Sequence, residues 1–270
     1  MKKSTLSLAL MSGKGGVGKS NLALNLGYAL AIQDFPVLLL DCDLGLANQD
    51  VLLGIRTQKN LLDVLNDEAQ VSETIIKIKS GWKSSYDILP AASGVPELVE
   101  MNPVMRDTLF RRLEPELANY DFVILDLGAG ISDTVQAFAA MAAIRVVVLT
   151  PEPTSLTDSY ALIKILYSNR GLDDFYVLVN QVENSKEEKD TYNRLSLACE
   201  KFISFKPKYI GSVRMDPKFP EAVRMQKPLL ELYPNTAAAN DIKQIAAQLE
   251  SIYQEMKPEL ADQPVFHPLL

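Results

Sequence analysis

The 270-residue chain is long enough to bury a large hydrophobic core, and α/β proteins of this size commonly form a single domain. Hydrophobic residues make up 47% of it and charged residues 23%, which is typical of a soluble globular protein. The net charge of −7 argues against general electrostatic attraction to DNA or anionic lipid, although a local basic patch is compatible with it.

The cysteines and the histidine exclude further classes of protein. Cys42 and Cys199 lie far apart without metal-binding spacing, and the single histidine, His267, argues against histidine-based catalysis. The sequence has neither a disulfide framework nor a signal-peptide pattern at residues 1–5, and no run of about 18 apolar residues could span a bilayer. We therefore expect a cytoplasmic protein.

A glycine-rich stretch follows an alternating apolar run, residues 6–11, and precedes apolar residues at helical spacing, residues 22–30. Strand, glycine loop and helix in this order are the context that a phosphate-binding loop requires. The glycines let backbone N–H groups turn toward a phosphate, and the helix N-terminus adds donors and a positive dipole end. The alternative is a glycine-rich turn that binds nothing, but the complete motif in this context favours nucleotide binding.

Two side chains of the motif carry the chemistry of such a loop. Lys19 supplies a point charge for the β- and γ-phosphates, and the Ser20 hydroxyl can ligate Mg²⁺. We therefore predict a site for a nucleoside triphosphate. The residues of this stretch that we expect to bind it are Gly13, Lys14, Gly15, Gly16, Val17, Gly18, Lys19, Ser20 and Asn21.

A wholly apolar run, residues 37–40, predicts a strand buried on both faces, as in a parallel sheet. Asp41 and Asp43 follow at its carboxyl end, the edge at which open α/β sheets bind ligands. Two carboxylates beside an anionic nucleotide repel it unless Mg²⁺ or a water molecule lies between them. The alternative is an aspartate- and asparagine-rich turn that its own side chains stabilise.

The middle of the chain predicts short helices in residues 60–80, a strand at 87–91 and a helix over 96–117. An apolar strand over residues 120–125 then ends at Asp126. This aspartate lies about a hundred residues after the phosphate-binding loop. Because of that combination, we predict that it holds Mg²⁺ through water. The alternative is an aspartate that merely caps the turn after the strand.

The pattern of the second half predicts three more strands, residues 144–149, 175–179 and 209–213, and a final helix around residues 242–256. Alternating strands and helices predict an α/β fold with a doubly wound, mostly parallel sheet and helices on both faces. We expect one ATPase domain over residues 1–257 and a flexible or strap-like tail over 258–270. The tail lacks the basic amphipathic pattern of a membrane-binding helix, so peripheral membrane association is an open alternative with little support.

Lys14 distinguishes the loop from an ordinary phosphate-binding loop, because residues 14–20 resemble the deviant Walker A box of the MinD/ParA/NifH ATPases. In that family the extra lysine reaches the nucleotide of the other subunit. The resemblance therefore implies that Lys14 acts across a homodimer formed with ATP. It also implies that Lys19 is catalytic, that Asp43 positions the attacking water and that Asp41 supports the Mg²⁺ shell.

The same resemblance implies a site for the base and the identity of the cofactors, ATP and Mg²⁺. An asparagine at the place of Asn180 contacts adenine in the family, and the loop that contains Asp216 frames the base. Arg214 stands where a proline is common, which leaves its part in base recognition open. A plain turn after a strand is the alternative for Asn180. The implied metal-binding residues are Ser20, Asp41 and Asp126.

Within the family, residues 18–21, 41–48, 126–131 and 150–155 resemble the FlhG branch (also called FleN or YlxH), which controls flagellar number and placement. The resemblance implies a dimerisation switch that hydrolyses ATP slowly. It also implies a flagellar-assembly partner, such as an FlhF-like GTPase or a component of the switch complex.

Other functions compete with this interpretation. A MinD-like role at the division site and a ParA-like role in partition are the nearest alternatives. Partition requires a basic surface for nucleic acid, which the net charge disfavours. A NifH-like metal-cluster carrier requires interface cysteines, and Cys42 and Cys199 do not fit a cluster motif. A scaffold that binds nucleotide without hydrolysing it is the non-enzymatic alternative.

Overall fold

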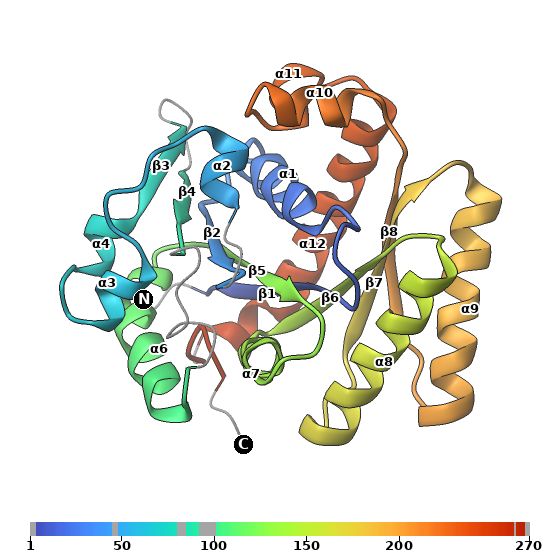
Figure 1. Ribbon diagram of the computed structural model, residues 1–270, viewed down its shortest axis with the longest axis horizontal. Coiled ribbons are helices and arrows are strands. Elements are labelled where there is room, and N and C mark those ends of the chain that lie inside the picture. Colours follow the sequence, from blue (N-terminus) through green and yellow to red (C-terminus); the bar gives the residue numbers. More distant parts are fainter. Residues whose placement is uncertain (1–3, 45–47, 80–84, 92–100, 262, 268–270) are drawn as a thin grey trace.

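The computed structural model describes residues 4–44, 48–79, 85–91, 101–261 and 263–267. These residues form one mixed sheet with the strand order β3-β4-β2-β5-β1-β6-β7-β8 and helices on both faces (Figure 1). Neighbouring strands are parallel except for the pair β3 and β4. The strands are β1 (Leu6–Ser12), β2 (Val37–Cys42), β3 (Ile76–Lys79), β4 (Tyr86–Leu89), β5 (Phe122–Ala129), β6 (Ile144–Leu149), β7 (Phe175–Val182) and β8 (Lys208–Arg214).

The helices connect these strands and cover the sheet (Figure 1). They are α1 (Lys19–Ala31), α2 (Gln49–Leu53), α3 (Leu61–Leu65), α4 (Val71–Thr74), α6 (Pro103–Leu117), α7 (Asp133–Met141), α8 (Pro153–Arg170), α9 (Ser185–Ile203), α10 (Lys218–Arg224), α11 (Leu229–Leu232) and α12 (Ala237–Leu260). Among the described residues, no helix combines the length and the apolar character needed to cross a membrane.

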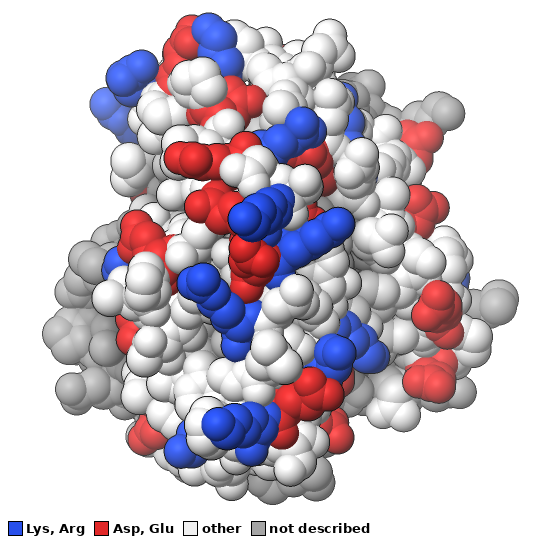
Figure 2. Space-filling model, turned by 90° about the vertical axis from the view of Figure 1, so that its right-hand side faces the viewer, with Lys and Arg blue, Asp and Glu red and all other residues white. Residues whose placement is uncertain are grey.

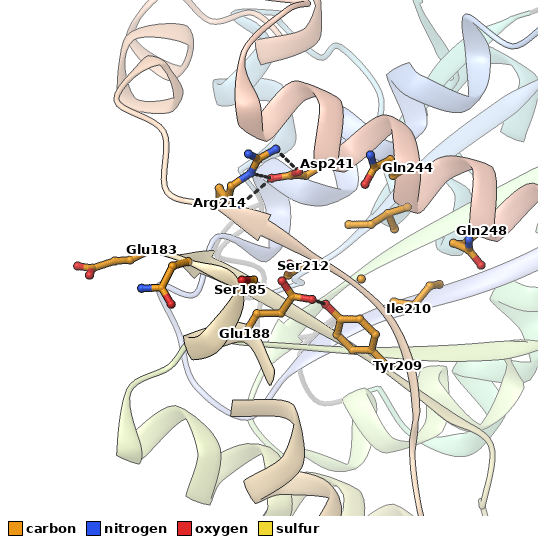
Figure 3. A pocket seen from close by; sticks show the side chains of 13 residues that line it. Glu183, Ser185, Glu188, Tyr209, Ile210, Ser212, Arg214, Asp241, Gln244 and Gln248 are labelled. Atoms are coloured by element: carbon orange, nitrogen blue, oxygen red, sulfur yellow. Dashed lines mark hydrogen bonds and ion pairs between the residues drawn. The ribbon is translucent and has the colours of Figure 1, made fainter. Parts of the chain in front are cut away.

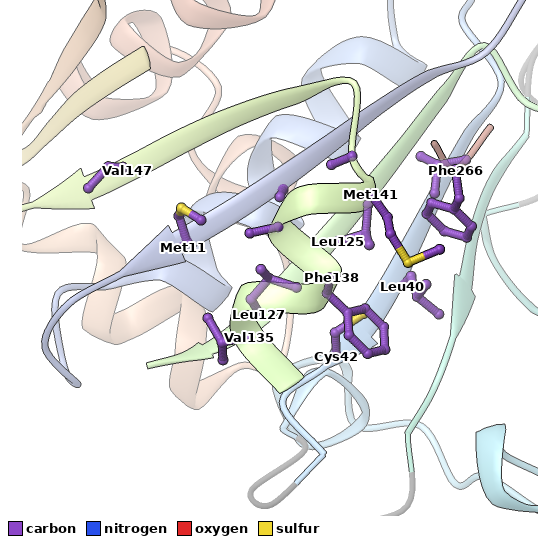
Figure 4. Packing of buried hydrophobic residues seen from close by; sticks show 14 of the residues in the cluster. Met11, Leu40, Cys42, Leu125, Leu127, Val135, Phe138, Met141, Val147 and Phe266 are labelled. Carbon is purple, nitrogen blue, oxygen red and sulfur yellow. The ribbon is translucent and has the colours of Figure 1, made fainter. Parts of the chain in front are cut away.

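Two hydrophobic clusters lie on opposite faces of the sheet. In β1, Leu8 and Leu10 pack with α1 and α12, whereas Ala9 and Met11 face the side that α6, α7, α8 and α9 cover. Figure 4 shows part of this second cluster, where Phe138 of α7 lies over β2 and β5. Because successive side chains of a strand point to opposite faces, a strand covered on both faces must be apolar throughout. This explains the continuous apolar runs in the sequence.

The position of β1 determines where a ligand can bind. β1 lies in the middle of the sheet, between β5 and β6. Strands β2 to β5 lie on one side of β1, and strands β6 to β8 lie on the other, so the strand order reverses direction at β1. In open α/β sheets a crevice forms at such a point, beyond the carboxyl ends of the strands. β2 and β5 pair in parallel register, and Asp41 lies directly beside Asp126. The sheet therefore brings two of the predicted metal-binding residues together.

The first half of the chain differs in part from the predicted elements. Residues 60–80 contain the short helices α3 and α4, but they end in β3, an antiparallel strand at the edge of the sheet. The helix expected over residues 96–117 is described only from Pro103 onward, where the side chain of Asn102 caps it by accepting the N–H of Met105. Residues 96–100 of that prediction lie outside the described residues.

The described C-terminal segment contacts the rest of the domain. α12 continues to Leu260 instead of ending near residue 257, and residues 263–267 pack against the domain. Val265 and Phe266 are each only 5% exposed, and both backbone N–H groups donate to the Glu114 carboxylate. The Phe266 ring contacts that of Phe110 with centroids 4.7 Å apart. Residues 263–267 are therefore anchored to α6 by hydrogen bonds and by an aromatic contact.

Because Phe266 fills space between α6 and α7, Phe266→Ala should lower the free energy of unfolding by about 3 kcal/mol, as other buried Phe-to-Ala changes do. Urea denaturation would measure this loss. Val104→Ala on the exposed side of α6 is the control and should change it by less than about 0.5 kcal/mol. A value for Phe266→Ala as small as that of the control would mean that the strap does not pack.

Candidate nucleotide-binding site

The glycine-rich loop lies between the end of β1 and the start of α1, as its sequence predicts. Gly18 is the N-cap of α1 and has φ of 87°, a left-handed conformation that other residues rarely adopt. A side chain at Gly18 would also lie 2.5 Å from Nδ2 of Asn180. At Gly13 it would lie 2.3 Å from the backbone of Asp158 in α8. These two glycines are therefore required by the conformation and by the close approach of neighbouring elements.

A cavity of about 350 Å³ opens above the loop and has the composition of a phosphate site. One side consists of the loop and the first turn of α1, and the other is formed by Asp43, by Asn48 and by residues of α2. Lys19, Ser20 and Asn21 begin α1, so their backbone N–H groups and the positive end of the helix dipole face an incoming anion. The predicted loop residues that line the cavity are Gly15, Gly16, Val17, Gly18, Lys19, Ser20 and Asn21.

A second cavity of about 550 Å³ adjoins the first, and both are lined by Gly16, Gly18 and Asn21. Its other walls are partly apolar, with Met215 and Phe219 among them, and its lining also includes Asn180 and Asp216. A flat base requires apolar contact and a few polar groups at its edge, which this cavity offers. The two cavities together therefore have the extent and the composition of a nucleotide site.

Asn180 and Asp216 are held in place by backbone groups. The Asn180 side chain is buried and its Nδ2 donates to the Val17 carbonyl at 2.7 Å, which fixes the loop against the end of β7. Asp216 accepts the N–H of Lys218 at 2.9 Å and that of Ala238 at 3.4 Å. Both predicted base-site residues thus line the second cavity in fixed orientations.

The Arg214 side chain points toward α12, so it is not free to contact the base. Its guanidinium donates to both carboxylate oxygens of Asp241, as Figure 3 shows, and this pairing raises the pKa of Arg214. The surrounding cavity of about 740 Å³, bounded by α9, β8 and α12, contains no residue of the glycine-rich loop. We therefore assign the nucleotide site to the two cavities at the loop and not to this larger one.

Lys19 forms a buried ion pair with Asp126 in the nucleotide-free protein. Its Nζ lies 2.5 Å from Oδ1 of Asp126, and both side chains are almost fully buried. Such a pair is stable only while each charge keeps a partner, because an isolated buried charge is costly. A phosphate group arriving at the loop would offer Lys19 an alternative partner and leave Asp126 available to a cation.

Asp41 is buried beside this pair and is held by three backbone N–H groups. Those of Asp43, Asn48 and Gln49 each donate to its carboxylate at 3.1 Å. Burial is the main reason that the pKa of Asp41 is raised to about 7, with the charge of Asp126 adding to the effect and the N–H groups opposing it. Residues 45–47 of the predicted segment 41–48 lie outside the described residues.

Gln49 is a member of the site that the sequence did not reveal. It is completely buried, and its Nε2 donates to Oδ2 of Asp126 at 2.6 Å and to the Ser20 carbonyl at 3.1 Å. Together with its backbone bond to Asp41, Gln49 contacts every residue expected to hold the metal. The only signal in the sequence was a polar residue directly after the asparagine of the segment that follows Asp43.

Lys14 lies at the mouth of the site, with 37% of its side chain exposed. Its Nζ contacts Oε2 of Glu152 at 2.5 Å and Oγ1 of Thr154 at 3.0 Å, both at the start of α8. The predicted lysine is therefore held within its own subunit in this structure. Glu152 also follows a strand, β6, at the carboxyl edge of the sheet, but it carries no motif that would mark it as a partner of Lys14.

The donor set can hold a magnesium ion. Among the described residues, no group of three His, Cys, Asp or Glu side chains could bind a metal by itself. Mg²⁺ at nucleotide sites, however, takes only one or two carboxylates and obtains its remaining oxygens from phosphates and water. Within the described part of the chain, two buried oxygens of residues that line the cavity, Ser12 Oγ and Asn48 Oδ1, lack a hydrogen-bond partner. Unpaired buried oxygens of this kind are expected at a site that binds a metal ion or a nucleotide.

Comparison with known proteins agrees with this geometry. Residues 8–229 match the model of the CobQ/CobB/MinD/ParA nucleotide-binding domain. The chain is 35% identical over 244 residues to the antiactivator FleN of Pseudomonas aeruginosa, covering 90% of this chain and 86% of that protein. It is 37% identical over 251 residues to the flagellum site-determining protein YlxH of Helicobacter pylori, covering 93% and 83%.

Solved structures give the same result for the fold. The MinC:MinD complex of Aquifex aeolicus matches with a TM-score of 0.76 and 26% identity over 92% of this chain and 96% of that chain. MinD of Pyrococcus horikoshii, solved with Mg-ADP, matches with a TM-score of 0.74 and 22% identity over 92% and 97%. The predicted doubly wound α/β fold is thereby confirmed.

The raised pKa of Asp41 predicts a pH dependence of stability for the metal-free protein. Between pH 4 and 7 the folded state binds a proton at Asp41 that the unfolded chain, with an ordinary pKa of 3.8, has lost. The free energy of unfolding should therefore fall as the pH rises through this range. In Asp41→Asn this part of the fall should be absent.

Urea midpoints at pH 5 and 7 in the presence of EDTA would measure both slopes. Asparagine keeps only one of the two oxygens that accept the backbone N–H groups, so the readout is the difference in pH slope and not the absolute stability. Equal slopes for the wild type and the variant would contradict a raised pKa at Asp41.

Proposed function

Because the chain belongs to the CobQ/CobB/MinD/ParA nucleotide-binding family, we propose that it is an Mg²⁺-dependent ATPase that dimerises with ATP and regulates flagellar number or placement. The family confirms the ATPase class predicted from the sequence. The observation that supports the proposal most is that Lys19 and Ser20 line the loop cavity, while the buried Asp126 pairs with Lys19 and lies in register beside Asp41.

Phosphate binding would use the loop and Lys19. The triphosphate would accept N–H groups from the loop and from the first turn of α1, and Lys19 would exchange Asp126 for the β- and γ-phosphates. Positioning and neutralisation of charge account for most of the catalysis in such reactions, with little acid–base chemistry. Slow turnover is therefore expected until a partner completes the site.

Ser20, Asp41 and Asp126 would hold Mg²⁺ together with phosphate oxygens and water. When bound, the ion neutralises charge on the β- and γ-phosphates. Asp41 and Asp126 lie side by side in register on β2 and β5, and both are buried. Burial, with the charge of Asp126 adding to it, raises the pKa of Asp41, so a cation bound beside Asp41 would stabilise its charged form.

Asp43 would orient the water that attacks the γ-phosphate. It is half-buried, lines the phosphate cavity, and its Oδ1 lies 3.3 Å from where a side chain on Gly128 would begin. The glycine turn after Asp126 therefore lets the two segments approach each other closely. Asn180 and Asp216 would face the adenine from the second cavity.

Dimerisation would release Lys14 from Glu152 and direct it to the nucleotide of the partner subunit. Because Lys14 is partly exposed at the mouth of the site, a second subunit can reach it without unfolding any element. The ion pair with Glu152 is exposed, and exposed pairs contribute little to stability, so the exchange costs little free energy. The loss of this contact would accompany formation of the ATP-bound homodimer.

The flagellar role is supported by the relatives, which are named for antiactivation and for determination of the flagellum site. A flagellar-assembly protein, such as an FlhF-like GTPase or a switch-complex component, would be the partner. On the face that Figure 2 shows, Lys and Arg alternate with Asp and Glu over the surface. A DNA-binding partition protein requires a basic surface, so this face gives no support to that alternative.

The mass in solution tests the proposed switch. With ADP the protein should have the mass of one chain, and with ATP and Mg²⁺ that of two. Asp43→Ala should remain dimeric with ATP, because it should bind the nucleotide but hydrolyse it at least about 100-fold more slowly than the wild type. Light scattering coupled to size exclusion would measure the mass. A mass that does not respond to nucleotide would contradict the switch and favour a scaffold.

Lys14→Ala tests the role of the exposed lysine. The variant should bind ADP as the wild type does and remain a monomer with ATP. Its rate of ATP hydrolysis should fall by about 100-fold or more. Lys164→Ala in α8 removes an exposed lysine outside the site and should change neither property. ATP-dependent dimerisation and hydrolysis at wild-type levels in Lys14→Ala would show that the lysine does not act across the interface.

A further inference from the structure

Gln49 is the buried polar residue of the site to which the proposed chemistry gives no role. It is 0% exposed and occupies the first position of α2. Its backbone N–H bonds to Oδ2 of Asp41, and its side-chain nitrogen bonds to Oδ2 of Asp126 and to the carbonyl of Ser20. One residue thus contacts all three of the residues proposed to hold Mg²⁺.

The orientation of the Gln49 amide indicates what it does there. The nitrogen, which carries two N–H donors, faces two oxygens, while the oxygen Oε1 has no partner among the described residues. A residue that served as a metal ligand would offer its oxygen, not its nitrogen. The positive end of the amide dipole therefore stands where a cation would otherwise stabilise the buried carboxylate of Asp126.

We propose that the side chain of Gln49 is an internal competitor of Mg²⁺. In the metal-free protein it satisfies Asp126 and Ser20, and it leaves Asp126 when the ion binds. This inference rests on the proposed Mg²⁺ site at Ser20, Asp41 and Asp126. Gln49 is a positioning residue in this scheme, because it acts on the metal-binding carboxylates and not on the reacting atoms.

The other end of α2 gives this movement a route to the base site. Nε2 of Gln226 donates to the carbonyl of Val51 at 2.8 Å, and a side chain on Gly54 would lie 2.7 Å from Oε1 of Gln226. Gln226 lies two residues after the end of α10, several residues of which line the base cavity. α2 is therefore held at Gln49 by the proposed metal-binding residues and at Val51 by Gln226.

Binding of ADP with and without Mg²⁺ tests the competition, since ADP is not hydrolysed. In the wild type, calorimetry should give a lower Kd with Mg²⁺ than in EDTA. Gln49→Ala removes the competitor only from the states that lack the ion. Its Kd for ADP in Mg²⁺ should therefore fall by about tenfold relative to the wild type, while its Kd in EDTA should not change.

Gln33→Ala is the matched control, because Gln33 follows α1 outside the site and its Oε1 is also buried without a partner. It should leave both Kd values unchanged. A Kd in Mg²⁺ that is unchanged or raised by Gln49→Ala, or one lowered equally in EDTA, would overturn the competition. A wild-type Kd that is the same with and without Mg²⁺ would instead overturn the proposed metal site.

A measurement on the wild type covers the case in which Gln49→Ala does not fold. The side-chain amide protons of Gln49 should be protected from solvent exchange in nitrogen-15 NMR spectra with ADP in EDTA. Addition of Mg²⁺ should shift this signal and remove the protection. A signal that does not respond to Mg²⁺ would contradict the proposal.

Discussion

Two carboxylates buried side by side, Asp41 and Asp126, are the constraint on which the site depends. They are 1% and 0% exposed and pair in register on adjacent parallel strands. Burial of like charges at this distance is costly unless cations or N–H donors compensate. In the nucleotide-free protein, Lys19 and Gln49 supply the compensation for Asp126, and backbone N–H groups supply it for Asp41.

The strand order of the sheet places this pair of aspartates side by side. β2 follows α1 directly in the chain but lies beside β5, so the carboxyl ends of β1, β2 and β5 meet at one edge. The glycine-rich loop leaves β1 at that same edge, and it can pass close to α8 and Asn180 because Gly13 and Gly18 have no side chains. Motifs more than a hundred residues apart in sequence therefore converge on one cavity.

The sequence predicted the features that depend on local pattern. The apolar strands, the glycine-rich loop with Lys19, and the aspartates at strand ends follow from spacing and residue type alone. The remaining features depend on single tertiary contacts: Gln49 against Asp126, Glu152 against Lys14, and Glu114 against the C-terminal strap. An isolated glutamine or glutamate has no pattern, and β3 pairs antiparallel at an edge where local sequence does not set the direction.

Nucleotide binding at this site is an exchange of partners more than an addition of new ones. Lys14 and Lys19 already contact carboxylates within the subunit, and the Nε2 of Gln49 already contacts Asp126. A phosphate or a cation that binds these groups must replace an existing contact. Only the difference in free energy between the new contact and the old one contributes to its affinity. In the proposed switch, Lys14, Lys19 and Asp126 would regain these partners once the nucleotide leaves, which would favour a reversible cycle.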